Sequence, residues 1–287
     1  MNTDKAELKI LINYWTFWDQ MNGPSKWSID RMIETTAEAG FDAFTCPSDT
    51  PELKSKLAAH GLRFGAAFQA FDKEQLKAEI ERGAKVDSGP MNCQLGEHDT
   101  SFETAVELTV ALMDLANENG VRVHLETHRG TCTETPEKTI SIVKECYRRR
   151  GRLPLINYDF SHFASFKHLE PKDYVDRLIE VNKGHFQLSN LWHMRPFNGH
   201  HCQVPVTDGQ GNFSPEYLEV RPFVREAIQT WLDGPQPTKT LWICPELGPF
   251  PGYGLSCFPD RWSDTKALAN DIKDIWAELN SPLCASR

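Results

Sequence analysis

The sequence predicts a single α/β domain over residues 1–287, a (β/α)8 TIM barrel. Short apolar runs recur eight times between longer helical patterns, as in repeated βα units that build a parallel sheet. The chain length of 287 residues lies in the range of such barrels. Its composition, 40% hydrophobic and 25% charged, is that of a folded globular protein. Eight units can also form an open doubly wound sheet, but we favour closure.

The eight predicted strands are short runs rich in apolar and β-branched residues. In chain order they cover residues 8–13, 41–47, 63–69, 91–96, 121–126, 153–159, 185–193 and 240–246. Their starts are separated by about one βα repeat, with a longer gap before the last strand. Residues 196–239 are therefore predicted to form a long loop after the seventh strand, over the barrel face where the βα loops converge.

Helix-like stretches between these strands carry capping signals at their ends. The stretch 28–40 opens on a serine and stops at a glycine. The stretch 100–120 offers Thr100 or Ser101 as its cap, followed by acidic residues and by leucines at helical spacing. The stretch 135–151 repeats the arrangement. Each of these helices would cover the outside of the barrel.

Charge and cysteine usage restrict the partners and the compartment. A net charge of -9 disfavours nucleic-acid binding, which normally rests on a basic surface. The eight cysteines form no C-x-x-C pair, which is typical of reduced thiols. No apolar stretch reaches the roughly 18 residues of a membrane span, and the N-terminus lacks a signal-like apolar region. We therefore expect a soluble cytoplasmic protein without membrane or nucleic-acid partners.

The last four predicted strands each end in a residue that can bind a metal. Glu126, Asp159, His193 and Glu246 follow in chain order. Each alone is weak evidence, because a carboxylate there can cap the next helix and a histidine can be a satisfied core residue. Together they favour a divalent ion such as Mn²⁺, Mg²⁺ or Co²⁺, since carboxylate and imidazole ligands suit hard or borderline ions. Mn²⁺ is the preferred cofactor, with Zn²⁺ as a further alternative.

Four segments carry a resemblance to a known family. HLETHRG, INYDFSH, LWHMRPFNGHHCQVP and CPELGP resemble the xylose isomerase-like barrels, the superfamily of sugar phosphate isomerases and epimerases. The resemblance covers essentially the whole chain. It implies that Glu126, Asp159, His193 and Glu246 hold one divalent ion. It also allows a homo-oligomer, because barrels of this family often pair through their helices.

The resemblance further implies residues that hold a substrate. His162, three residues after the aspartate, matches the family histidine that points at substrate oxygens. Its alternative role is to orient a ligand or cap a helix. Arg195 matches an arginine that commonly holds substrate hydroxyls. Arg129 could instead brace the site or pair with a surface carboxylate.

The chemistry implied by this set is enolisation of a sugar-like carbonyl compound. A metal that binds the carbonyl and hydroxyl oxygens of an α-hydroxy ketone stabilises the enediolate. Glu126 and Glu246 would then remove and return the proton on opposite faces, as in an isomerase or epimerase. The same intermediate can expel a leaving group, so a lyase or dehydratase acting on an inosose or a 3-keto-glycoside is the alternative. Histidines that could serve as its acid are His128, His162, His200 and His201.

Two aromatic side chains are candidates for contacts with the sugar. Trp15 follows the first strand within an aromatic cluster, where rings could stack on a sugar or pack against the barrel rim. Tyr253 lies in the Gly- and Pro-rich loop after Glu246, near the expected mouth of the barrel. No phosphate-binding glycine motif occurs in this loop.

Two other functions fit the sequence less well. Apurinic-site endonucleases share this barrel, but their three-metal site needs histidines from the third and fourth strands and an Asp-x-His element after the seventh. Here the third strand ends in Gln69, the fourth offers only His98 beyond its end, and the Asp-x-His element is missing. A non-catalytic sugar-binding barrel is disfavoured because all four ligand positions are filled.

Overall fold

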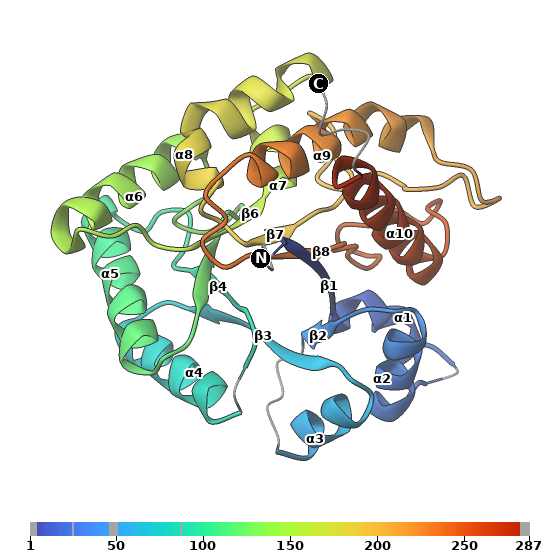
Figure 1. The fold of residues 1–287 in the computed structure, drawn as a ribbon, viewed down its shortest axis with the longest axis horizontal. Helices are drawn as coiled ribbons and strands as arrows, with labels where there is room; N and C mark the ends of the chain where they lie inside the picture. Colours follow the sequence, from blue (N-terminus) through green and yellow to red (C-terminus); the bar gives the residue numbers. More distant parts are fainter. Residues whose placement is uncertain (1–4, 25, 46–50, 87, 282–287) are drawn as a thin grey trace.

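A computed structural model describes residues 5–24, 26–45, 51–86 and 88–281. Its eight parallel strands form a closed barrel in which each strand pairs with its neighbours in chain order and β8 pairs with β1 (Figure 1). This confirms the predicted (β/α)8 barrel. The strands are β1 (Glu7–Asn13), β2 (Ala43–Thr45), β3 (Arg63–Ala70), β4 (Met91–Leu95), β5 (Val123–Glu126), β6 (Ile156–Asp159), β7 (Leu191–His193) and β8 (Thr240–Cys244).

Helices cover the outside of this barrel (Figure 1). The α-helices are α1 (Trp18–Asn22), α2 (Ile29–Glu38), α3 (Pro51–Ala59), α4 (Lys73–Lys85), α5 (Phe102–Glu118), α6 (Pro136–Arg150), α7 (Phe160–Phe166), α8 (Lys183–Phe186), α9 (Pro215–Leu232) and α10 (Arg261–Leu279). Short 3-10 or π segments are η1 (Tyr14–Phe17), η2 (Pro171–Asp173), η3 (Val175–Ile179) and η4 (Glu180–Asn182). Ser28, Ser101 and Thr135 cap α2, α5 and α6 through their side chains, as their sequence positions predict.

The seventh and eighth strands differ from their predicted extents. The prediction started the seventh strand at His185, but His185 and Phe186 lie in α8, and β7 has three residues. A short apolar run is compatible with a buried strand and with a buried helical turn, because both bury most of their side chains. The eighth strand ends at Cys244, so Glu246 lies two residues beyond it. The predicted end of the second strand, residues 46 and 47, falls outside the described residues.

The segment after β7 combines a loop with a long helix. Residues 194–214 contain one isolated antiparallel bridge, between Thr207 and Phe213, and α9 follows. Asp264 of α10 holds this loop, because its carboxylate accepts the Val206 N–H at 2.9 Å and the Thr207 hydroxyl at 2.5 Å. The loop is therefore tied to the last helix of the barrel.

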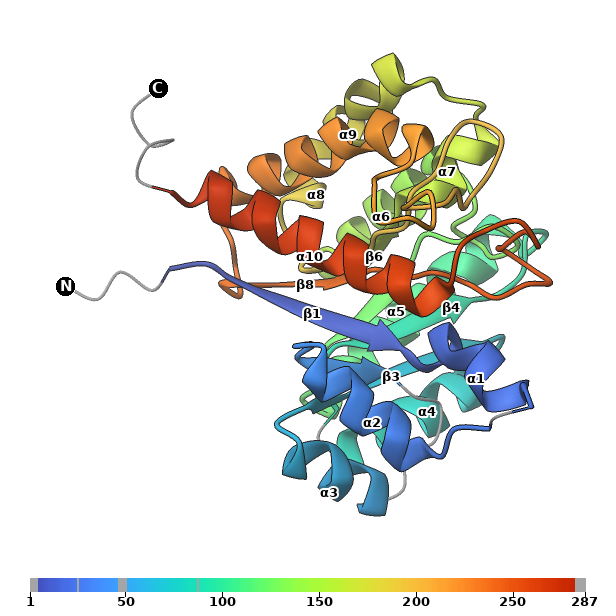
Figure 2. The same cartoon turned by 90° about the vertical axis from the view of Figure 1, so that its right-hand side faces the viewer.

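The carboxyl ends of the strands meet at one face of the barrel. Figure 2 shows β1 pointing toward the side where the loop between β8 and α10 lies. The described parts of β5, β6 and β7 are fully buried, as expected for strands covered by helices and by the barrel interior. Among the described residues, no helix is long and apolar enough to cross a membrane. The six cysteines within the described ranges are free thiols.

Candidate metal centre

The four predicted ligands come together at the carboxyl ends of their strands. Glu126 ends β5, Asp159 ends β6, His193 ends β7 and Glu246 follows β8. Asp159 and His193 are directly paired in the sheet, which places them at the same level of the barrel. One ligand atom from each of the four side chains lies within 4.8 Å of the other three. All four residues are buried, with at most 4% of their surface exposed.

Each of the three carboxylates uses one oxygen for anchoring and directs the other toward the shared centre. Asn92 donates to Oε2 of Glu126 at 2.6 Å, and Asn13 donates to Oε1 of Glu246 at 3.1 Å. The Ser161 backbone N–H donates to Oδ1 of Asp159 at 3.0 Å. The remaining oxygens, Oε1 of Glu126, Oε2 of Glu246 and Oδ2 of Asp159, contact cationic or imidazole groups.

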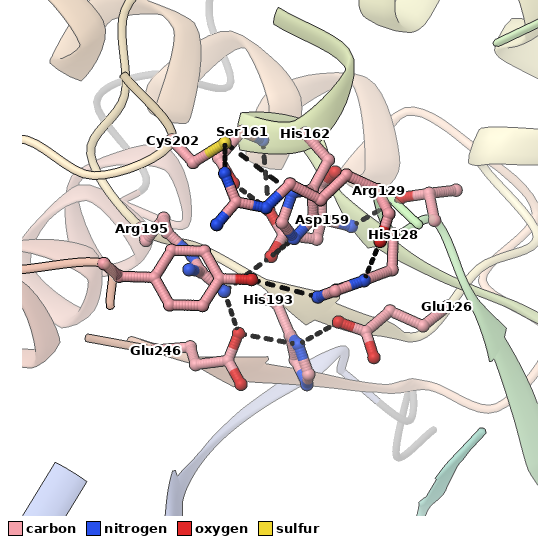
Figure 3. Close-up of polar contacts among 12 residues, drawn as sticks. Glu126, His128, Arg129, Asp159, Ser161, His162, His193, Arg195, Cys202 and Glu246 are labelled. Atoms are coloured by element: carbon pink, nitrogen blue, oxygen red, sulfur yellow. Dashed lines mark hydrogen bonds and ion pairs between the residues drawn. The ribbon is translucent and has the colours of Figure 1, made fainter. Parts of the chain in front are cut away.

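His193 stands between the two glutamates (Figure 3). Its Nδ1 lies 3.0 Å from Oε1 of Glu126 and 3.0 Å from Oε2 of Glu246. Burial opposes a charge on this imidazole, yet Glu246 and Glu126 raise the pKa of His193 well above its usual value. Burial likewise opposes ionisation of both glutamates, but His193 lowers the pKa of each below the usual range. The three groups therefore share a strong electrostatic interaction.

Asp159 caps the next helix and still directs one carboxylate oxygen at the shared centre. It caps α7 through Oδ1, and Oδ2 remains directed at the centre. Thr127 holds the strand end itself: its hydroxyl accepts the Asp159 N–H at 2.8 Å and donates to the Asp159 carbonyl at 3.1 Å. Burial raises the pKa of Asp159, although Arg195 acts in the opposite direction. Capping thus fixes the orientation of this carboxylate without consuming its inner oxygen.

Arg195 lies inside the cluster rather than at its rim (Figure 3). Its Nη2 donates to Oδ2 of Asp159 at 2.9 Å and also contacts Oε2 of Glu246. The residue is 1% exposed, and its Nε and Nη1 are buried without a hydrogen-bond partner. Burial alone would lower its pKa, but Asp159 and Glu246 raise the pKa of Arg195 above its usual value. Two donors of a permanent cation are therefore available beside the carboxylates.

Two further histidines border the centre. His162 is fully buried, and its Nε2 lies 3.4 Å from Oδ2 of Asp159 without forming a hydrogen bond. Burial, with the neighbouring His128, holds the pKa of His162 well below its usual value. The rings of the two histidines are 4.1 Å apart, and their nitrogens lie within 4.8 Å of a Glu126 oxygen. Both imidazoles thus face the same volume as the carboxylates.

Tyr253 packs against the histidine and arginine side chains that border the carboxylates. Its hydroxyl lies 3.0 Å from Nε2 of His128, and its ring lies 4.2 Å from the guanidinium carbon of Arg195 and 4.6 Å from that of Arg129. The Trp15 ring meets it edge-on at 5.6 Å. Burial raises the pKa of Tyr253 to about 12. Trp15 and Tyr253 are both half-buried, so the two predicted aromatic residues form one cover at the mouth of the barrel.

The two histidines of the loop after β7, His200 and His201, lie outside the candidate metal centre. His200 and His201 are exposed, and Asn198 accepts both of their backbone N–H groups. They belong to neither group of metal-competent side chains within the described residues. Of the histidines that the sequence offers as acids, His128 and His162 are the ones beside the carboxylates.

The donor set fits one divalent ion. Ligands on opposite sides of an ion at about 2.2 Å are roughly 4.4 Å apart, and the four ligand atoms all lie within 4.8 Å of one another, so one ion can reach all four. Three inward carboxylate oxygens and one imidazole are the donors that Mn²⁺, Mg²⁺ and related ions accept. The ion, together with Arg195, would balance the negative charge of these three carboxylates.

The sequence analysis missed the residues that orient the ligands. Asn13 and Asn92 anchor Glu246 and Glu126, and Asn157 donates to Oδ1 of Asn92 at 2.8 Å. Cys202 lies 3.7 Å from Nδ1 of His162 and accepts from Arg129 at 3.5 Å. The signal for the asparagines was a buried polar residue in a barrel strand, which requires a partner. Cys202 gave no such signal, because it lies in an irregular loop.

Solved structures with the same architecture include sugar epimerases and a dehydratase. The D-allulose 3-epimerase from Methylomonas sp. in complex with D-allulose has a TM-score of 0.60 and 15% identity, covering 95% of this chain and 97% of that chain. The protein shares its (β/α)8 barrel fold with these structures. The probable 3-DHS dehydratase AsbF from Bacillus anthracis gives a TM-score of 0.59 and 16% identity, with coverage of 93% and 98%.

A third barrel of this fold carries a metal. The IOLI protein with a binding zinc atom has a TM-score of 0.55 and 14% identity, covering 94% of this chain and 97% of that chain. No protein-family model and no curated protein sequence matches the chain. The resemblance predicted from the four sequence segments is thus confirmed as a likeness of fold.

Proposed function

We propose that the protein is a divalent-metal-dependent isomerase or epimerase that acts on a sugar or keto-sugar through an enediolate. The observation that carries this proposal is the arrangement of the carboxylates. Glu126, Asp159 and Glu246 each hold one oxygen by a neighbour and direct the other at a buried centre shared with His193. A structural ion-pair network does not require each carboxylate to keep one oxygen free of its anchoring hydrogen bond, whereas a cation site does. Sugar epimerases with the same fold agree with the proposal.

The four side chains Glu126, Asp159, His193 and Glu246 would hold the ion, with Mn²⁺ as the proposed metal. When bound, it would act as a Lewis acid that stabilises negative charge on substrate oxygens. The zinc atom of the IOLI protein supports a metal in this fold.

Glu126 and Glu246 are the proposed proton-transfer groups. They contact the same nitrogen of His193 from two sides, so their inner oxygens face a common volume from different directions. One carboxylate can take a proton from the substrate carbon while the other returns one. The asparagine bonds hold each carboxylate in its orientation toward the common volume.

Arg195 and His162 are proposed to bind the substrate. Nε and Nη1 of Arg195 and Nε2 of His162 are buried polar atoms that have no hydrogen-bond partner. Such atoms are costly unless a ligand or water satisfies them, so they mark where substrate oxygens would lie. Tyr253 covers this volume together with Trp15, and the loop that carries Tyr253 would have to move aside to admit a sugar.

A lyase or dehydratase is the second candidate, and a specific contact favours it. The Tyr253 hydroxyl and Nε2 of His128 lie 3.0 Å apart beside the carboxylates. This pair could protonate a leaving hydroxyl or aglycone at the same intermediate. The probable 3-DHS dehydratase shares the fold.

Solvent exchange tests the proposed function. The full chain with Mn²⁺ would be incubated in D₂O with D-fructose, D-tagatose, D-psicose, the keto-sugar acid D-fructuronate and a 3-keto-glucoside, and the sugars followed by NMR. Deuterium uptake next to the carbonyl, abolished by EDTA, is the expected result. Formation of an epimer identifies the isomerase, and release of water or aglycone identifies the lyase. Absence of exchange in all sugars would remove the enolisation proposal.

A further inference from the structure

Arg129 carries a positive charge that no carboxylate balances. It lies in the loop between β5 and α6 and is exposed. Its Nη1 donates to the Cys202 thiol at 3.5 Å, and its guanidinium lies over the Tyr253 ring. Among the described residues, none of the carboxylates forms an ion pair with it, so the pairing with a surface carboxylate that the sequence allowed is not observed.

The charges beneath Arg129 already sum to zero once the proposed ion is bound. Glu126, Asp159 and Glu246 contribute three negative charges, and a divalent ion with Arg195 contributes three positive charges. A metal-bound imidazole is neutral. The guanidinium of Arg129 is then an additional single charge at the entrance of the site. A single anionic group on the incoming molecule would complement this charge.

The position of Arg129 suits contact with one end of a bound sugar. The guanidinium carbons of Arg129 and Arg195 lie 4.6 Å and 4.2 Å from the centre of the Tyr253 ring. Figure 3 shows the guanidinium of Arg129 beside Cys202, with Asp159 between it and the two glutamates in this view. A substrate that binds at the four candidate ligands and reaches past Tyr253 would bring its distal end to Arg129.

We propose that the substrate is an anionic sugar, a keto-sugar acid whose carboxylate binds Arg129. This inference rests on the proposed function and adds the class of substrate. The planar guanidinium accepts a carboxylate through two parallel hydrogen bonds, and stacking on Tyr253 keeps it in the required orientation. A carboxylate fits better than a phosphate ester, because one surplus positive charge matches one negative charge.

A matched pair of probes tests this assignment. D-fructuronate differs from D-fructose in carrying a carboxylate at carbon 6, and both leave the carbonyl end unchanged. Their dissociation constants on the Mn²⁺-loaded full chain would be measured by calorimetry at low and high salt. We expect D-fructuronate to bind about 10- to 100-fold more tightly than D-fructose, as for a charge-assisted hydrogen bond, and its affinity alone to fall with salt.

Variants of Arg129 distinguish two roles of this side chain, binding the anionic end of the substrate and positioning Tyr253. Arg129→Gln should lose about 10- to 100-fold in affinity for D-fructuronate and leave the affinity for D-fructose within twofold. Arg148→Gln, on the exposed end of α6, is the matched control and should change neither. An equal loss for both probes would mean that Arg129 only positions the tyrosine, which contradicts the proposal.

The remaining outcomes are also decisive. Equal binding of the two probes, or binding of neither, contradicts an anionic substrate. Tighter binding of D-fructose 6-phosphate than of D-fructuronate contradicts the carboxylate assignment. Preference for the acid without any solvent exchange would contradict the proposed function and leave the anion site standing, whereas exchange without that preference would contradict the anion site alone.

Discussion

At the residue scale, the candidate site depends on how each carboxylate is oriented. A free glutamate can rotate both oxygens, but Glu126 and Glu246 are each fixed by one asparagine. The cost of burying these charges is offset by His193, which contacts both glutamates, and by Arg195, which contacts Glu246. Under the proposed function, removing the charge of one glutamate would affect metal binding and proton transfer together, so the two effects need separate measurements.

Glu126→Gln and Glu246→Gln are each expected to lower the rate of solvent deuterium exchange by about 10²- to 10⁴-fold, because a glutamine cannot take up the proton. The measurement is NMR-detected exchange at saturating Mn²⁺, with metal content determined in parallel. Glu118→Gln, on the exposed end of α5, is the control and should keep the wild-type rate. A wild-type rate in either site variant would show that the paired-base assignment is wrong.

Asn92→Ala tests the anchoring of Glu126. Loss of this hydrogen bond frees the carboxylate, and removal of such outer partners typically weakens metal affinity about 10- to 100-fold. Mn²⁺ titration by electron paramagnetic resonance measures the change directly. Asn117→Ala, at an exposed position on α5, serves as the control. Unchanged Mn²⁺ affinity in a folded Asn92→Ala protein would argue against an orienting role.

At the element scale, local sequence signals predicted the helices better than the last strands. Ser28, Ser101 and Thr135 cap their helices because capping depends on neighbours within three residues. The beginning of β7 was predicted wrongly because α8 and a strand would bury the same apolar side chains, and their three-dimensional packing decides between them.

Thr135→Ala should lower the free energy of unfolding by about 1 kcal/mol. The Thr135 hydroxyl accepts the Lys138 N–H at 3.2 Å, and its loss leaves one helix-end donor without a side-chain partner. Urea unfolding followed by circular dichroism measures the difference. Thr135→Ser retains the acceptor and should restore most of the stability. Equal losses in both variants would indicate a packing effect of the methyl group instead of capping.

At the scale of the whole molecule, closure of the barrel explains why the four strand-end residues of the site could be predicted from the sequence. The four ligands were predictable because strand ends of a closed barrel meet at one face. The contacts of Tyr253 with Arg129, Arg195 and His128 join three separate loops, and no local pattern specifies how such loops pack. The sequence placed Tyr253 near the mouth but could not place it against both guanidinium groups.

Metal binding should stabilise the entire barrel, since its ligands come from four different strands or strand ends. An ion that binds only the folded state at a hundredfold excess over its dissociation constant adds about 2.7 kcal/mol. Thermal unfolding with Mn²⁺ and with EDTA measures this shift. Asp159→Asn should reduce the Mn²⁺-dependent increase in Tm. An equal increase in the wild type and the variant would place the metal elsewhere.

His185 predicts how stability depends on pH. The ring is buried, its Nε2 donates to the Pro154 carbonyl at 2.9 Å, and its Nδ1 accepts from Asn182 at 3.2 Å. Both bonds suit the neutral imidazole, and burial holds the pKa of His185 below its usual value. In the unfolded chain the imidazole takes up a proton near pH 6.5, while in the folded chain it resists protonation.

Stability should therefore be lost as the pH falls from about 6.5 toward the lowered pKa of the folded state, by up to about 1.4 kcal/mol per pH unit. His185→Gln removes this contribution, so its unfolding free energy should fall less steeply over the same interval, whatever its absolute stability. Urea unfolding from pH 7 to pH 5 gives both slopes. His60→Gln, at an exposed position, should retain the wild-type slope. Parallel slopes for the wild type and His185→Gln would mean that folding does not lower the pKa of His185.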